Sequence, residues 1–90
     1  MLETLENLIK LARDRKTFPV EGSYTNKLLD DKSLSKAKVL EEVDELIGAV
    51  EENSNIIHEA ADVLYHLLMY LEANDIKIED VMSELEKRKK

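Results

Sequence analysis

The segment from Ile56 to Leu71 constrains the fold most, because it is apolar almost all the way round when it is wound as an α-helix. Its apolar positions are Ile56, Ile57, Ala60, Ala61, Val63, Leu64, Leu67, Leu68, Met69 and Leu71. A helix without a polar face must be covered on every side by other parts of the protein. The chain has only 90 residues, too few for its other helices to surround this one. We therefore predict that a second copy covers it and that the protein is a homodimer.

The rest of the chain also favours helix, because it contains only two glycines and one proline. Apolar residues at helical spacing predict helices over about 2–15, from 33 or 35 to 52, from a cap at 54 or 55 to about 73, and over about 78–88. Ser23 can also cap a short helical turn toward Leu29. Short connections make successive helices antiparallel neighbours. The predicted fold is all-α: one domain over residues 1–90, an antiparallel bundle of about four helices.

Composition excludes several classes of protein. The absence of cysteine removes disulfides, thiolate metal ligands and a cysteine nucleophile. The 20 acidic and 13 basic residues give a net charge of −7, which argues against a nucleic-acid partner. The longest strongly apolar run, residues 63–71, is about half of a membrane span, and residues 1–6 lack the features of a signal peptide. We therefore expect a cytoplasmic protein without a membrane partner.

Two pairs of acidic residues stand beside apolar stripes on neighbouring predicted helices. At about 100° per residue, Glu42 borders the apolar stripe of its helix and Glu45 lies one step beyond it. Glu59 and Asp62 are placed in the same way on the next helix. Two antiparallel helices would direct these four carboxylates toward one another, and the second helix contains no lysine or arginine to compensate them.

Four converging carboxylates repel one another unless a cation lies between them. Oxygen-only ligation favours a hard divalent ion, Mg²⁺ or alternatively Mn²⁺. Such an ion usually binds substrate phosphates as well, so the pattern favours phosphoanhydride hydrolysis, with a carboxylate that orients or deprotonates water. Spacing alone leaves another class open, a non-enzymatic helical oligomer whose acids form a solvated surface. A carboxylate-bridged di-iron protein is disfavoured, because its usual Glu-x-x-His pairs are missing.

Four segments of the chain resemble a known family. They are EGSYTNKLL at 21–29, KVLEE at 38–42, EAADVLYHLL at 59–68 and IEDVMSEL at 78–85. Together with the pattern Glu42-x-x-Glu45 followed by Glu59-x-x-Asp62, they resemble the phosphoribosyl-ATP pyrophosphohydrolases, a family of the MazG-like all-α nucleoside triphosphate pyrophosphohydrolases. The resemblance spans almost the whole chain in order.

The resemblance implies Mg²⁺-dependent hydrolysis of a small nucleotide, 1-(5-phospho-β-D-ribosyl)-ATP. The products would be phosphoribosyl-AMP and pyrophosphate, and the reaction is the second step of histidine biosynthesis. The implied metal ligands are Glu42, Glu45, Glu59 and Asp62. The implied catalytic acids are Glu41, Glu42 and Glu45, one of which orients the attacking water. The residues expected to meet substrate phosphate or ribose groups are Ser23, Tyr24, Thr25, Lys27 and Lys38.

The chain departs from this family at several positions near the acids. The family usually has glycine where Leu40 stands, a second lysine where Ala37 stands, and small residues around Val43 and Asp44. Bulk at Leu40 is expected to affect packing near the acids, and the missing lysine removes one phosphate contact. These departures bear on the substrate more than on the reaction class. A house-cleaning pyrophosphohydrolase of ordinary or modified nucleoside triphosphates is therefore the alternative.

Both histidines lie on the predicted helix that carries Glu59 and Asp62. His66 falls on the same side as these acids, so it is either a group of the metal site or, more simply, a hydrogen-bonded packing residue. His58 begins the helix and is expected to be exposed. Tyr65 is expected in the core or at the dimer interface.

Overall fold

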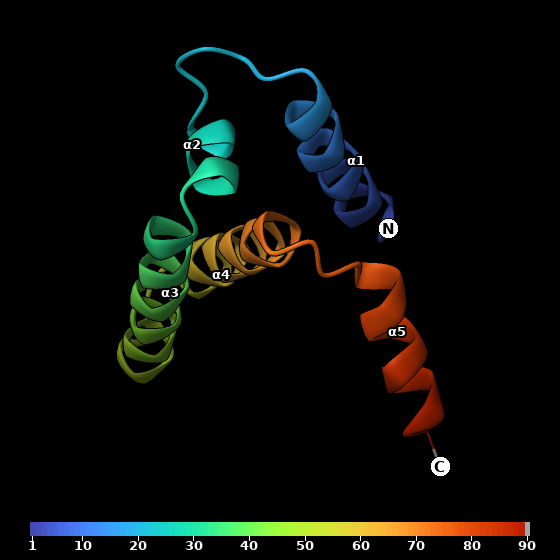
Figure 1. Cartoon of the computed structure of the whole chain (residues 1–90). Coiled ribbons are helices and arrows are strands. Elements are labelled where there is room, and N and C mark those ends of the chain that lie inside the picture. Colours follow the sequence, from blue (N-terminus) through green and yellow to red (C-terminus); the bar gives the residue numbers. More distant parts are fainter. Residues whose placement is uncertain (90) are drawn as a thin grey trace.

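The computed structural model describes residues 1–89, which fold into five helices. They are α1 (Glu3–Thr17), α2 (Tyr24–Asp30), α3 (Lys32–Glu52), α4 (Ile56–Ala73) and α5 (Ile78–Lys87) (Figure 1). None of the described residues lies in a β-strand. The all-α prediction is confirmed, and the short turn expected after Ser23 is a helix of its own.

Side-chain caps fix where α2 and α3 begin. The Ser23 hydroxyl accepts a hydrogen bond from the backbone N–H three residues later, at 3.2 Å, as predicted. Asp31 caps α3 by accepting from the Leu34 N–H at 3.0 Å. The helix begins at Lys32, one residue before the earlier of the two predicted starts, because the Asp31 carboxylate already satisfies a first-turn N–H, and Ser35 is fully buried inside the helix.

α3 and α4 are joined by a short turn and pack more extensively on each other than any other two helices, so they form a helical hairpin. Asn53 and Asn55 adopt left-handed conformations, with φ of 52° and 56°, which asparagine tolerates better than most residues. The buried residues of α3 are Ser35, Glu42 and Ala49. Their spacing of seven residues forms one stripe along the helix, so a carboxylate lies in the contact face of the hairpin.

The apolar core lies between α1, α2 and the C-terminal half of α4. Its buried members are Ile9, Ala12, Leu28, Leu29, Leu68 and Met69. Leu28 and Met69 are the largest fully buried side chains. This core fixes α2 against α4, and it thereby brings Tyr24 and Thr25 at the start of α2 to the middle of α4.

α5 lies apart from the hairpin (Figure 1). None of its described residues is buried, and Ile78 alone is half-buried against the core. Arg13 of α1 holds it through two hydrogen bonds to the Glu79 carboxylate, at 2.6 and 2.8 Å. The expected antiparallel packing of the last helix against α4 is not observed, because Asp75, with φ of 56°, turns the chain away.

One copy of the chain leaves much apolar surface exposed. The apolar stripe of α3 consists of Leu40, Val43, Ile47 and Val50, and the exposed apolar residues of α4 are Ile57, Leu64 and Leu67. The chain therefore covers α4 only in part, and the homodimer stays a prediction. Within residues 1–89 no helix is both long and apolar enough to cross a membrane.

Candidate active site

The two helices of the hairpin carry the four carboxylates that the sequence singles out. α3 carries Glu42 and Glu45 one turn apart, and α4 carries Glu59 and Asp62 with the same spacing. Burial raises the pKa of Glu42 above its ordinary 4.5, and hydrogen bonding and repulsion from Glu45 raise this pKa further. Burial also raises the pKa of Glu59, again with contributions from Glu45. Asp62 adds to both shifts, so the four acids that the sequence singles out act on one another across the hairpin.

Two oxygen atoms of this cluster are buried without a hydrogen-bond partner in the described part of the chain: Oε2 of Glu42 and Oε2 of Glu59. Leaving such a group unpaired costs about 1–3 kcal/mol, and more when it is charged. Lys38 compensates one side of the cluster, because its Nζ lies 3.1 Å from Glu41 Oε2 and 3.6 Å from Glu42 Oε1. One lysine does not balance several acids, so the cluster is short of positive charge.

The donor set fits a hard divalent cation. On α3, one carboxylate oxygen from each of Glu41, Glu42 and Glu45 lies within 4.8 Å of the others. On α4, ligating atoms of His58, Glu59 and Asp62 also lie within 4.8 Å of one another. Carboxylate oxygens with unsatisfied lone pairs are the ligands that Mg²⁺ and Mn²⁺ prefer. Each helix therefore presents a group of donors that suits such an ion, and the two groups are separate, one on α3 and one on α4.

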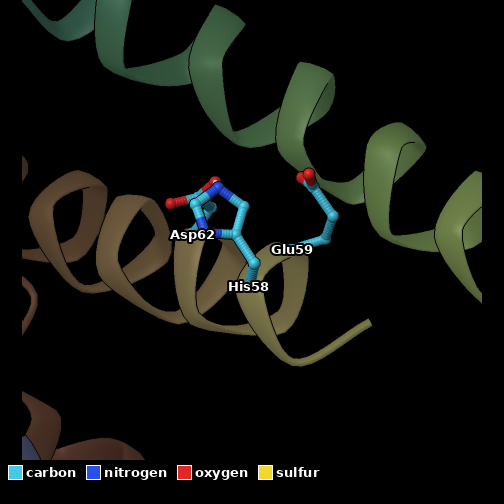
Figure 2. Close-up of side chains that lie close together, drawn as sticks. All are labelled: His58, Glu59 and Asp62. Carbon is cyan, nitrogen blue, oxygen red and sulfur yellow. The ribbon is translucent and has the colours of Figure 1, made fainter. Parts of the chain in front are cut away.

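Figure 2 shows how the group on α4 is arranged. The Glu59 side chain points toward α3, whereas the His58 ring lies beside the Asp62 carboxylate. His58 Nε2 is 3.4 Å from Asp62 Oδ2. His58 is exposed, as predicted. Its contact with Asp62 was not predicted, although a spacing of four residues on one helix indicates such a contact. His58 gives this carboxylate a partner that is positive when protonated.

Ser23 lies where the loop after α1 meets α2. Besides capping α2, its hydroxyl accepts a hydrogen bond from Arg15 Nη1 at 2.7 Å. The contact of Arg15 with Ser23 was not predicted. The position of Arg15 in the last turn of the helix before this loop could have indicated a cation near Ser23. Lys27 is exposed in the last turn of α2 and lines the same open pocket as Ser23. Arg15 and Lys27 thus place positive charge near Ser23.

Tyr24 and Thr25 differ in what they offer a ligand. Thr25 is buried, and its hydroxyl shares a 2.6 Å hydrogen bond with Tyr65, which is half-buried against the core as predicted. Tyr24 is 45% exposed, and its hydroxyl lies 3.0 Å from Nε2 of His66. His66 is buried and hydrogen-bonded, in agreement with the simpler of its two predicted roles. Of these residues, Tyr24 presents the most surface.

The predicted site residues form two groups in one chain. Glu45 and Glu59 line an open pocket of about 270 Å³ next to the turn between α3 and α4. Ser23 and Lys27 line another, of about 720 Å³. Tyr24 lies between the groups: burial raises its pKa, and the charges of Lys38, Glu42 and Glu41 also act on it. Tyr24 and the acids are therefore electrostatically coupled.

The departures from the family pattern lie on the surface of the single chain. Leu40 is 66% exposed and belongs to the apolar stripe of α3. Its bulk therefore does not press on the acids within one copy. Ala37, Val43 and Asp44 are exposed as well. The second lysine of the family is absent at Ala37, but Lys38 is present and contacts the acids directly.

Comparison with known proteins finds relatives over nearly the whole chain. Residues 3–89 match the sequence model of the family described as Phosphoribosyl-ATP pyrophosphohydrolase. A phosphoribosyl-ATP pyrophosphatase of Methanococcoides burtonii is 43% identical, over 98% of this chain and 94% of the relative. One of Listeria innocua is 47% identical, over 98% of this chain and 84% of the relative.

A longer relative also matches. The histidine biosynthesis bifunctional protein HisIE of Pyrococcus furiosus is 44% identical over 99% of this chain, which covers 43% of that protein. No solved structure matches the chain. The family match and the two relatives of similar length span nearly all of the chain. The chain therefore belongs to the phosphoribosyl-ATP pyrophosphohydrolase family.

Proposed function

We propose that the chain hydrolyses 1-(5-phospho-β-D-ribosyl)-ATP to phosphoribosyl-AMP and pyrophosphate, the second step of histidine biosynthesis. The family match and the relatives named phosphoribosyl-ATP pyrophosphatase support this activity. The observation that carries it is the acid cluster of the hairpin, in which Glu42 and Glu59 each keep a buried carboxylate oxygen without a partner. A site that lacks positive charge in this way suits a metal-bound polyphosphate.

The metal would be Mg²⁺, or Mn²⁺ in its place. Glu42, Glu45, Glu59 and Asp62 would hold it, and when bound it would neutralise the charge of the phosphates. Glu41 lies beside these ligands and is paired with Lys38, at 3.1 Å. One of Glu41, Glu42 and Glu45 orients the attacking water and takes its proton, while the α–β phosphoanhydride bond breaks and pyrophosphate leaves.

A chain with a net charge of −7 needs local cations to attract so anionic a substrate. Lys38 supplies such charge beside the acids, Lys27 supplies it in the pocket that Tyr24 and Ser23 line, and Arg15 adds to it at Ser23. These residues, with Tyr24 and the neighbouring Thr25 backbone, would contact phosphate and ribose groups. We further propose a cytoplasmic homodimer, in which a second copy covers the apolar stripe of α3.

The test is release of pyrophosphate from phosphoribosyl-ATP with Mg²⁺, compared with release from dCTP and dUTP. We expect turnover of phosphoribosyl-ATP to dominate. Glu45→Gln should lower the rate at least about a hundredfold with the fold intact, as is usual when a catalytic carboxylate is removed. Glu51→Gln is the matched control, because Glu51 is exposed on the same helix outside the acid cluster.

Three outcomes would contradict parts of the proposal. A clear preference for dCTP or dUTP would favour a house-cleaning enzyme over the histidine pathway. If Mg²⁺ changed neither the thermal stability nor any hydrolysis rate, the chain would be a non-enzymatic helical oligomer. Full activity of Glu45→Gln would mean that other acids carry the reaction.

A further inference from the structure

The start of α2 and the middle of α4 meet through two adjacent hydrogen bonds between side chains. Tyr24 Oη lies 3.0 Å from His66 Nε2, and Thr25 Oγ1 lies 2.6 Å from Tyr65 Oη. The Tyr24 ring also stacks on Tyr65, with centroids 6.4 Å apart, and meets the edge of the His66 ring at 5.9 Å. Two neighbouring residues of α2 are thus matched to two neighbouring residues of α4.

Hydrogen-bond chemistry determines which nitrogen of His66 carries the hydrogen. His66 Nδ1 lies 2.9 Å from the backbone oxygen of Asp62, and a carbonyl oxygen can only accept. Nδ1 therefore donates, and Nε2 of the neutral ring is an acceptor. The Tyr24 hydroxyl must then donate its one hydrogen to Nε2. Its oxygen keeps its lone pairs, so Tyr24 can accept a further hydrogen bond but not donate one.

This pair of hydrogen bonds connects α2 to the acid cluster. His66 follows Asp62 by one turn of α4, so the ring that holds Tyr24 is itself held by the backbone of a proposed metal ligand. Lys38 and Glu42 act electrostatically on Tyr24 from α3. Because His66 is buried and Tyr24 is nearly half exposed, His66 fixes the position of a side chain that stays open to a ligand.

We propose that His66 is a positioning residue for the hydrolysis, because it holds the Tyr24 side chain beside the acid cluster as a pure hydrogen-bond acceptor. An acceptor suits a hydroxyl of the substrate ribose, whereas phosphate oxygens can only accept and would need a donor. The inference rests on the proposed function. The sequence predicts that Tyr24 contacts phosphate or ribose groups of the substrate. As a hydrogen-bond acceptor, Tyr24 would contact a ribose hydroxyl and not a phosphate.

Variants of His66 separate its two hydrogen bonds. Asparagine places a polar group near Nδ1 but does not reach Tyr24, whereas glutamine places one near Nε2. His66→Asn and Tyr24→Phe should each raise the KM for phosphoribosyl-ATP about tenfold with little change in kcat, which is the effect of about one lost hydrogen bond. The double variant should be no worse than either single one. His66→Gln should stay within about threefold of the wild type.

Tyr65→Phe is the matched control, because it removes the neighbouring hydrogen bond to Thr25 from the same contact. It should lower the melting temperature about as much as His66→Asn does while KM stays near the wild-type value. The inference is overturned if His66→Asn leaves KM unchanged. It is also overturned if the KM of the double variant rises by the product of the increases in His66→Asn and Tyr24→Phe. If the wild type does not turn over phosphoribosyl-ATP at all, the proposed function is contradicted instead.

A second measurement needs no substrate. Long-range ¹H–¹⁵N NMR distinguishes the two tautomers of a histidine ring. We expect hydrogen on Nδ1 of His66, and Tyr24→Phe should shift the Nε2 resonance alone. Hydrogen on Nε2 would overturn the inference whatever the kinetics show, because Tyr24 would then be the acceptor of that bond.

Discussion

At the scale of single residues, Glu42 and Glu59 are held where their charged forms are disfavoured. Burial is the main cause for both, and the neighbouring carboxylate of Glu45 adds to it. Each also keeps an oxygen atom that no described group satisfies. The metal-free protein therefore binds protons at these positions more tightly than the unfolded chain does, and it should gain stability when a cation or a proton neutralises them.

This difference predicts a pH dependence of the metal-free protein. An acid whose pKa is raised on folding contributes stability below its ordinary pKa, and this stability is lost as the pH rises through the folded-state pKa. The melting temperature should therefore fall as the pH is raised above the ordinary carboxyl pKa of 4.5, and Glu42→Gln should flatten the dependence. An unchanged slope in Glu42→Gln, measured by circular dichroism in chelator, would show that the shifted acid is not the cause.

At the scale of the helices, Arg13 joins three elements. It donates from α1 to Glu72 of α4 at 3.1 Å and to Glu79 of α5 at 2.6 and 2.8 Å. Glu72 is buried, whereas Glu79 is exposed, and hydrogen bonding to Arg13 lowers the pKa of Glu79 to about 2. Lys16 adds a second contact, from its ammonium group to the Glu72 backbone oxygen at 2.7 Å. These contacts fix the end of α4 and the start of α5.

Arg13→Met and Glu79→Gln should lower the free energy of unfolding by unequal amounts, because Glu72 is buried and Glu79 is exposed. Arg13→Met should lower the free energy of unfolding by about 2 kcal/mol, because it leaves the buried Glu72 carboxylate without its donor. Glu79→Gln should cost less than about 1 kcal/mol, because its ion pair is exposed to solvent. Urea titrations of both variants measure the difference. Equal losses would mean that the attachment of α5, rather than the burial of Glu72, limits stability.

The hairpin was the part of the fold that its sequence predicted best. Apolar residues at helical spacing and the polar break at 53–55 set the bounds of α3 and α4 closely. The placement of α5 was not predictable, because it depends on Arg13 and Glu79, which lie 66 residues apart. The acids of the site were found by their spacing within each helix. The contact between Tyr24 and His66 was not, because it arises only when the core brings α2 onto α4.

At the scale of the whole molecule, one copy is open rather than compact. Its radius of gyration is 14.1 Å, whereas about 12 Å is usual for a compact domain of this length. The apolar stripe of α3 and the exposed apolar residues of α4 account for much of the uncovered surface. Apolar patches of this kind usually mark an interface. A second copy would cover them, and the same hairpin would then carry both the acids and the interface.

The dimer is tested by placing a charge in the apolar stripe of α3. Ile47→Asp should weaken association at least about a hundredfold. In a dimer with two-fold symmetry both copies carry the substitution, so the interface loses two buried apolar side chains. Sedimentation equilibrium measures the association directly. Thr4→Asp is the control, since it adds the same charge on an exposed position of α1. A monomeric wild type, or an Ile47→Asp variant that associates normally, would contradict the predicted interface.

The central claim is that α3 and α4 hold a divalent cation between their carboxylates, and anomalous diffraction from a crystal soaked in Mn²⁺ tests it most directly. We predict a peak bounded by Glu42 and Glu45 on one helix and by Glu59 and Asp62 on the other. Four carboxylates splayed toward solvent with no peak between them would contradict the claim, whatever activity the protein had.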